Sequence, residues 1–69
     1  MKNDVRTYRE AENLSQADLA ATVGVSRQTI NAIERERYDP SLELAFKLAD
    51  HFDCRIADLF DPEPDGTDE

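Results

Sequence analysis

Apolar side chains recur at helical spacing along most of the chain, and residues 16–35 contain two such stripes separated by a glycine. Ser15 precedes the first stripe as a helix N-cap, and Asp18 three residues later completes a variant of the capping box. Gly24 ends this helix, because glycine reaches the left-handed conformation without steric cost. Ser26 then caps a second helix. The pattern therefore predicts two short helices joined by a tight turn.

The second of these helices has two chemically different faces. At about 100° per residue, Ile30 and Ile33 fall on one side, and polar groups cluster on the other. Gln and Asn can bond adenine bidentately, and Arg can do the same for guanine. This arrangement is typical of a helix-turn-helix, whose second helix enters the DNA major groove. The outer face predicts base contacts by Arg27, Gln28, Asn31 and Arg35.

The chain resembles the Cro/repressor-type (XRE-like) helix-turn-helix regulators of lambdoid phages and their small bacterial and archaeal relatives. The resemblance covers roughly residues 4–60 through LSQADLA, VGVSRQTI, AIER, YDPSLELAFKLA and IADLF. It is nearest to small stand-alone repressors like the cytolysin-operon repressor. A single Gly or Gln would be weak evidence, but the whole pattern at fixed spacing is specific. The family signature falls here on Gln16, Ala20, Gly24, Ile30 and Ile33.

The resemblance implies an all-α, five-helix lambda-repressor-like domain over residues 1–60, with the helix-turn-helix at 16–35. Residues 61–69 form an acidic tail without apolar residues, which predicts disorder. Pro62 and Pro64 leave room for at most a very short strand there. The apolar stripes predict no sheet and a core of Val5, Tyr8, Leu14, Leu19, Ala20, Val23, Val25, Ile30, Ile33, Leu42, Ala45, Leu48, Ala49, Phe52, Ile56 and Leu59.

The family likeness also implies roles for residues outside the base-reading face. Arg9 is expected to pair with Glu34 and to tie the first helix to the recognition helix; the alternative is a solvated base on a helix face. In the family, the loop after the recognition helix lies along the phosphates. For Arg37 and Tyr38, simple solvent exposure is the alternative. The expected phosphate contacts are Gln16, Ser26, Thr29, Arg37 and Tyr38.

The charge of the chain fits a DNA-binding domain poorly. Eight Lys and Arg face sixteen Asp and Glu, which leaves a net charge of −8, whereas such domains are usually basic. Residues 56–69 hold six acids and no base, and only two of the eight bases are Lys. An Asp-rich, Lys-poor surface predicts a protein from a halophilic archaeon, kept soluble in molar salt. An ordinary acidic tail on an ordinary small domain is the alternative.

Length and composition exclude several classes of protein. Sixty-nine residues allow one domain with one core. One Cys with one His cannot supply a four-ligand zinc site, so no metal or cofactor is expected, and Cys54 is expected to be a small buried hydrophobe. The chain lacks a signal peptide and any membrane-length apolar run, which predicts a cytoplasmic protein without membrane contact. Without a nucleophile–base pair or a phosphate-binding Gly loop, neither an enzyme nor a small-molecule ligand is expected.

Two hypotheses about function remain. The first is a homodimeric, sequence-specific transcriptional regulator, a repressor that binds a palindromic operator in double-stranded DNA, because one recognition helix covers too few bases. The second is a protein-interaction module on the same fold, such as an antitoxin or a coactivator-like bridge, which the negative charge favours. Relatives pair near the last helix, so the expected dimer interface is Ile56, Leu59 and Phe60. For Phe60 the alternative is that it only closes the monomer core.

Overall fold

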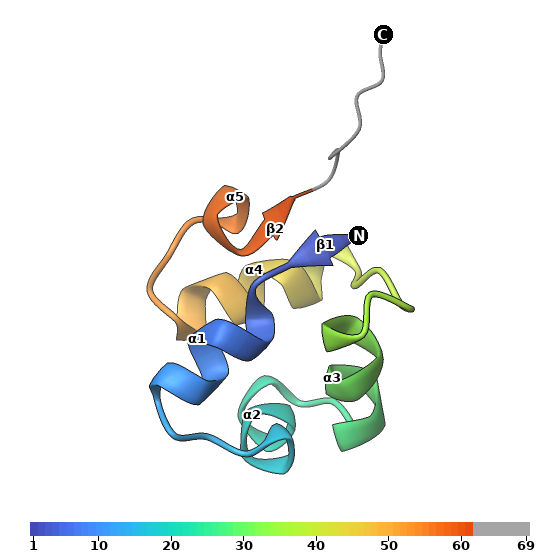
Figure 1. Cartoon of the computed structure of the whole chain (residues 1–69), viewed down its shortest axis with the longest axis vertical. Coiled ribbons are helices and arrows are strands. Elements are labelled where there is room, and N and C mark those ends of the chain that lie inside the picture. The colour runs from blue at the N-terminus through green and yellow to red at the C-terminus, as the bar shows by residue number, and fades with distance from the viewer. Residues whose placement is uncertain (62–69) are drawn as a thin grey trace, which may run out of the picture.

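The computed structural model describes residues 1–61, and the five-helix domain expected from the sequence is confirmed. In Figure 1, α2 and α3 lie at one end of the molecule and α5 with two short strands at the other, with α4 between them. In chain order the elements are β1 (Lys2–Asn3), α1 (Val5–Ala11), α2 (Gln16–Val23), α3 (Arg27–Glu34), α4 (Leu42–His51), α5 (Ile56–Leu59) and β2 (Phe60–Asp61).

Serine side chains begin three of the helices. Ser15 Oγ accepts the backbone N–H of Asp18 at 2.9 Å, and the Asp18 carboxylate accepts the Ser15 N–H at 3.3 Å, which completes the predicted capping box. Ser26 Oγ accepts the N–H of Thr29 at the start of α3. Ser41 Oγ does the same for Leu44 at the start of α4. These bonds satisfy backbone donors that a helix leaves unpaired in its first turn.

Each of the first four helices is followed, within two residues of its end, by a residue with positive φ: Asn13, Gly24, Glu36 and Asp53. Gly24 at φ +80° is the predicted turn glycine. Glu36 at φ +62° was not expected from the sequence, because a side chain disfavours this conformation. It is held by two backbone bonds of 2.9 Å, from the Glu36 N–H to the Ile33 carbonyl and from the Arg37 N–H to the Ala32 carbonyl. This pairing is the Schellman pattern.

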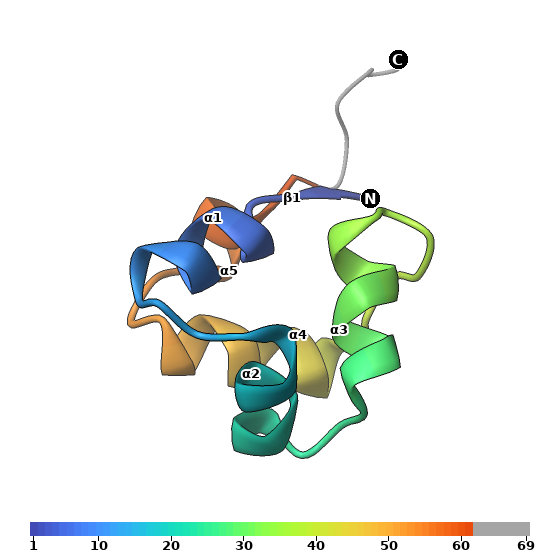
Figure 2. The same ribbon diagram turned by 60° about the horizontal axis from the view of Figure 1, so that its bottom comes forward.

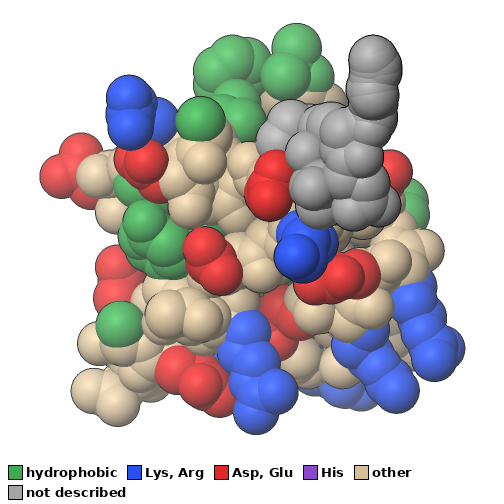
Figure 3. All heavy atoms as spheres, turned by 45° about the horizontal axis from the view of Figure 1, so that its top comes forward, with side chains coloured by type: hydrophobic (Ala, Val, Ile, Leu, Met, Phe, Trp, Pro, Cys, Tyr) green, Lys and Arg blue, Asp and Glu red, His purple; other side chains and the backbone are tan. Residues whose placement is uncertain are grey.

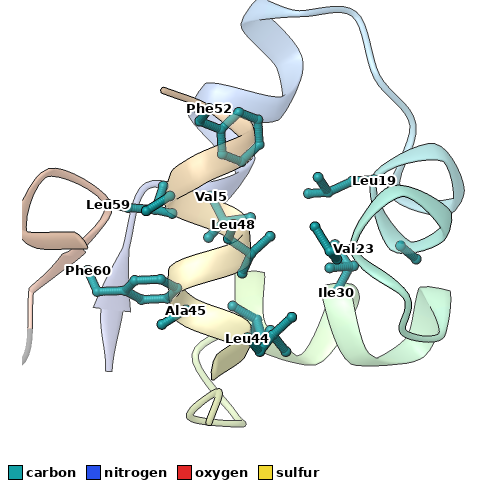
Figure 4. Close-up of a cluster of buried hydrophobic side chains, with 13 residues drawn as sticks. Val5, Leu19, Val23, Ile30, Leu44, Ala45, Leu48, Phe52, Leu59 and Phe60 are labelled. Atoms are coloured by element: carbon teal, nitrogen blue, oxygen red, sulfur yellow. The ribbon is translucent and has the colours of Figure 1, made fainter. Parts of the chain in front are cut away.

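The core is built around α4. In Figure 4, Leu59 and Phe60 approach α4 from one side, and Leu19, Val23 and Ile30 face it from the other. Among the predicted core positions, Tyr8, Val25 and Ile56 are only partly buried against this cluster, as is Cys54. Burial also raises the pKa of the Cys54 thiol. The buried face of α4, here called the α4 stripe, consists of Ala45, Leu48, Ala49 and Phe52. It lies between the helix-turn-helix and the C-terminal elements.

Two predicted core positions lie outside the core cluster. Leu14 is half-buried but does not belong to it. Leu42 is 69% exposed, whereas Leu44, which the sequence analysis left out of the core, is 7% exposed. At about 100° per residue, both lie roughly 70–90° from the centre of the α4 stripe, on opposite sides of it. Periodicity therefore could not choose between them. The packing of the neighbouring helices buries the Leu44 side of the stripe and leaves the Leu42 side open.

The expectation that the chain forms no sheet is also wrong. β1 and β2 pair antiparallel within the chain, with Lys2 opposite Asp61 and Asn3 opposite Phe60. So short a pair is made by backbone groups and needs no apolar stripe of its own. Phe60, in extended conformation, folds back onto the core and is 3% exposed. Asp61, expected to begin the tail, lies in β2, and the rest of the predicted tail, with its two prolines, lies outside the described residues.

Candidate nucleic-acid interface

The turn between α2 and α3 places the second helix across the first. The Gly24 and Val25 N–H groups both donate to the Ala20 carbonyl, at 2.8 and 2.9 Å, which closes the end of α2 tightly. Ile30 and Ile33 are fully buried beneath α3. Figure 2 shows α2 and α3 side by side, joined by this turn. The inner face of α3 is thus occupied by core packing, and its outer face is turned away from the core.

Three of the four residues expected to read bases lie on the exposed surface of α3. Arg27 and Gln28 are exposed in its first turn, and Arg35 is exposed at its C-cap. Asn31 is half-buried, and its Nδ2 lies 3.5 Å from Gln16 Oε1. Gln28 is the residue whose amide is both exposed and free to rotate toward a base edge. Asn31 is partly engaged by a neighbouring helix.

Arg9 anchors α3 to α1. Its Nε donates to Glu34 Oε2 at 2.7 Å and its Nη2 donates to Glu34 Oε1 at 3.1 Å, so the pair is bidentate. The Arg9 and Glu34 side chains are only 11% and 4% exposed. A third bond, from Arg9 Nη1 to the Leu14 carbonyl, holds the segment between α1 and α2. The hydrogen bond to Glu34 raises the pKa of Arg9, so the guanidinium remains protonated.

Gln16 brings α2 into the same network. Its Nε2 donates to Glu34 Oε1 at 3.0 Å. The carboxylate of Glu34, a residue of α3, therefore accepts hydrogen bonds from Arg9 of α1 and from Gln16 of α2. A primary amide carries two N–H donors, and the bond to Glu34 uses one of them. Gln16 is half-buried, which leaves its amide partly exposed. Gln16 therefore braces α3 and keeps a second N–H donor on its amide.

The other residues expected to contact phosphates lie at the two ends of α3. Ser26 is exposed and Thr29 half-buried, and their hydroxyls lie 3.0 Å apart in addition to the capping bond. Arg37 and Tyr38 are exposed in the loop that follows α3, and Tyr38 is 48% exposed. Arg37, the charged residue among these four, takes part in none of the ion pairs, which join other residues. That statement covers residues 1–61.

Arg6 is a residue that the sequence analysis missed. It lies on α1 and, with Arg35, borders a polar depression whose other walls are Arg9, Gln16, Asn31 and Glu34. Its side chain is 71% exposed and forms an ion pair with Glu10, one helical turn away. No local pattern distinguishes Arg6 from other surface bases. Its position depends on α1 packing against α3.

Basic and apolar side chains are concentrated in different parts of one face of the molecule. In Figure 3, Lys and Arg side chains lie mostly along the lower and right edges, hydrophobic side chains lie mostly at the upper edge and on the left, and acidic side chains are spread among both. The large apolar residues that stay exposed are Met1, Tyr38, Leu42 and Phe46. A groove between α4 and α5 includes two of them and is lined by Met1, Pro40, Leu42, Ala45, Ile56, Ala57 and Phe60.

Two of the three residues expected at the dimer interface are largely buried within the single chain. Leu59 and Phe60 are 1% and 3% exposed, although Phe60 also lines the groove. Phe60 instead closes the monomer core, because β2 pairs with β1 and turns the ring onto α4. Ile56 remains half-buried at the groove. Leu42 and Phe46 of α4 expose more apolar surface, at 69% and 58%.

Nowhere in residues 1–61 do three His, Cys, Asp or Glu side chains converge as a metal site would require. Within the same range, each helix is too short or too polar to cross a membrane.

Fold and site together define a class of protein. A short helix, a tight glycine turn and a second helix with a buried apolar face and an exposed Arg/Gln face make a helix-turn-helix DNA-binding domain. Comparison with known proteins agrees, because the helix-turn-helix family profile matches residues 5–59. The chain belongs to the Cro/repressor-type (XRE-like) helix-turn-helix family of DNA-binding transcriptional regulators.

Individual relatives show the same likeness. An HTH-type transcriptional regulator of Methanocaldococcus jannaschii is 57% identical over 65 residues, which cover 94% of this chain and 98% of the relative. The crystal structure of the restriction-modification controller protein from Aeromonas hydrophila superposes with a TM-score of 0.74 at 36% identity, covering 81% of this chain and 85% of that one. The N-terminal DNA-binding domain of SinR from Bacillus subtilis gives a TM-score of 0.74 at 26% identity, with 88% and 90% covered.

Proposed function

We propose that the protein is a homodimeric transcriptional repressor that acts in the cytoplasm and reads a palindromic operator through the major groove. The observation that carries this proposal is the anchored α3. Its inner face is packed in the core, Glu34 is bound by Arg9 and Gln16, and Gln28 is left exposed between Arg27 and Arg35. A rigid scaffold that presents exposed donors and acceptors is what direct readout of bases requires.

The proposal is tested by selecting bound duplexes from a random pool, at low and at molar potassium chloride. We expect an enriched inverted repeat with half-sites about 34 Å apart, because two copies related by a twofold axis place their recognition helices one turn of DNA apart. The intergenic DNA beside the gene should contain the same repeat if the protein represses its own promoter. A pool without an enriched sequence would contradict the proposal.

The acidic surface supports a second candidate function. A net charge of −8 opposes approach to a polyanion, and it favours a basic protein partner for an antitoxin or a coactivator-like bridge. Under this alternative, selection from the random pool yields no preferred sequence. The exposed arginines around α3 favour the DNA-binding proposal, because they concentrate positive charge where the helix-turn-helix meets DNA.

Replacing Gln28 with Ala is expected to cost about 1–3 kcal/mol of binding at one base pair and to relax the preference there, because the bidentate amide is lost. Competition binding against all single substitutions of the selected duplex measures this effect. The matched control is Thr22→Ala, since Thr22 is exposed on α2 near Lys47 and Asp50 of α4, away from the recognition face. Wild-type preference at every position of the duplex would show that Gln28 does not read bases.

We propose that a second copy docks on the apolar groove between α4 and α5. The groove and Phe46, one helical turn from Leu42 on α4, carry exposed apolar surface that α3 does not use, and a twofold dimer would pack two copies of this surface against each other. Replacing Leu42, which is 69% exposed, with Glu should yield a monomer that folds normally. Binding to a duplex with both half-sites should weaken more than 100-fold (an order-of-magnitude expectation from losing a linked second contact), while binding to one half-site should not change.

Sedimentation measures the dimer, and Lys47→Gln is the control because it changes the charge of exposed α4 by the same −1. If the acidic composition reflects a halophilic source, as we propose, the dimer should strengthen from low to molar potassium chloride, since salt screens the repulsion between two chains of charge −8. A wild-type protein that is monomeric whenever it binds the operator would contradict the dimer. Dissociation as salt rises would contradict the screening argument.

A further inference from the structure

Asn3 connects the first strand to the end of the recognition helix. Its Nδ2 donates to the Ile33 carbonyl at 2.8 Å and to the Met1 carbonyl at 3.2 Å. Its Oδ1 accepts the backbone N–H of Val5 at 3.1 Å. Because the Val5 N–H can only donate, the amide must be oriented with its nitrogen toward the two carbonyls. Figures 1 and 2 both show the N-terminal end of the chain beside the C-terminal end of α3.

The Ile33 carbonyl belongs to the turn that ends α3. It also accepts the Glu36 N–H at 2.9 Å, so two donors converge on it. Glu36 has a φ of +62°, which side chains disfavour, so the turn needs support from its surroundings. Arg35 and Arg37 flank Glu36 and are both exposed. The bond from Asn3 therefore supports the turn that carries Arg35 and Arg37, two arginines expected to contact DNA.

The other side of Asn3 is tied to the core. Asn3 lies opposite Phe60 in the strand pair, and Phe60 is 3% exposed against α4. The neighbouring Asp4 N–H donates to the Leu59 carbonyl at 2.9 Å. The backbone of Asn3 is thus held by the C-terminal elements, while its side chain reaches α3 across 30 positions of sequence. This makes Asn3 a direct link between the strand pair and the recognition helix.

We propose that Asn3 is a positioning residue for DNA recognition, which holds the C-terminal turn of α3 in the orientation that presents Arg35 and Arg37. The proposal rests on the proposed function for its DNA readout. Asn3 also receives the Val5 N–H at the start of α1, so a test must separate that role from the bond to α3.

Asn3→Asp separates the two roles. The carboxylate keeps an acceptor for the Val5 N–H, and it loses the donor to the Ile33 carbonyl. Lys2→Gln is the matched control, because it makes the same −1 change in charge on the adjacent exposed residue of β1. Asn3→Ala, which introduces no charge, is the second variant if the Asp variant does not fold.

Two measurements are made on each variant. In the free protein, amide hydrogen exchange is followed residue by residue. Exchange at Glu36 and Arg37 should be about three- to tenfold faster in Asn3→Asp, the effect of one lost hydrogen bond, while α2 keeps wild-type protection. Affinity for the duplex selected with the wild-type protein should fall by about three- to tenfold relative to Lys2→Gln. Affinity for a shuffled duplex of the same composition should match that of Lys2→Gln.

Each result decides the matter. The proposal is supported if exchange at the turn is faster and the affinity for the selected duplex, but not for the shuffled duplex, is lower than in Lys2→Gln. Wild-type exchange at Glu36 and Arg37 overturns it, and so does faster exchange with unchanged preference, because Asn3 would then be a purely local contact. If the wild-type protein prefers no duplex at all, the proposed function fails, and the exchange data alone then support or overturn the positioning of the turn by Asn3.

Discussion

Replacing Arg9 with Met is expected to lower the free energy of unfolding by about 3–5 kcal/mol, the usual cost of leaving a buried charge without its partner. The Glu34 side chain is 4% exposed, and without Arg9 its carboxylate retains only the Gln16 amide as a donor. The Leu14 carbonyl also loses its bond. A domain of this size has only about 3–10 kcal/mol of stability in total. Urea denaturation should therefore show the variant largely unfolded or close to it.

Two further variants show where the loss comes from. Arg6→Met makes the same substitution on the same helix, but Arg6 and Glu10 are 71% and 54% exposed, so the cost should be below about 1 kcal/mol. Arg9→Met combined with Glu34→Gln should recover much of the lost stability, because a neutral amide is easier to bury than a lone carboxylate. An Arg9→Met variant with the urea midpoint of the wild type would show that the ion pair does not stabilise the fold.

Replacing Ile33 with Ala is expected to cost about 2–5 kcal/mol, because it removes a fully buried side chain and leaves a cavity under the recognition helix. Ile33 is fully buried on the inner face of α3, so the packing of the core and the position of the exposed face of α3 depend on the same residue. Thermal denaturation measures the loss. The operator affinity of any folded fraction shows whether the reading face has moved.

Ile33→Val provides the graded control. It removes one methyl group and should cost about 0.5–1.5 kcal/mol. An ordered series of wild type, Val and Ala is the signature of a packing contribution. An Ala variant that melts at the wild-type temperature would show that Ile33 is not part of the core, in conflict with its complete burial.

The reading face of α3 was predictable from spacing alone. Helical periodicity assigns side chains to faces without reference to any other element, so Ile30 and Ile33 could be placed inside and Gln28 outside from the sequence. The contact between Arg9 and Glu34 spans 25 positions, and spacing cannot report it. That contact was suggested by family resemblance. Arg6 had no such support, and it was missed because its place beside Arg35 depends on how α1 packs.

Local signals were sufficient for the helices and the turns between them. Ser15, Ser26 and Ser41 cap their helices through bonds that reach three residues along the chain, and Gly24 turns it by its own φ. Such interactions involve residues only a few positions apart, so they can be predicted from the sequence without knowledge of the tertiary structure.

Tertiary packing alone decided the remaining features. Leu42 and Leu44 flank the α4 stripe at similar angles, and only the neighbouring helices determine which is buried. Phe60 became a core residue because β2 pairs with a strand 57 positions earlier, Asn3 facing Phe60. The Asn3 side chain likewise reaches the end of α3 only in the folded chain. These contacts join segments far apart in sequence, and they exist only once the core has brought those segments together.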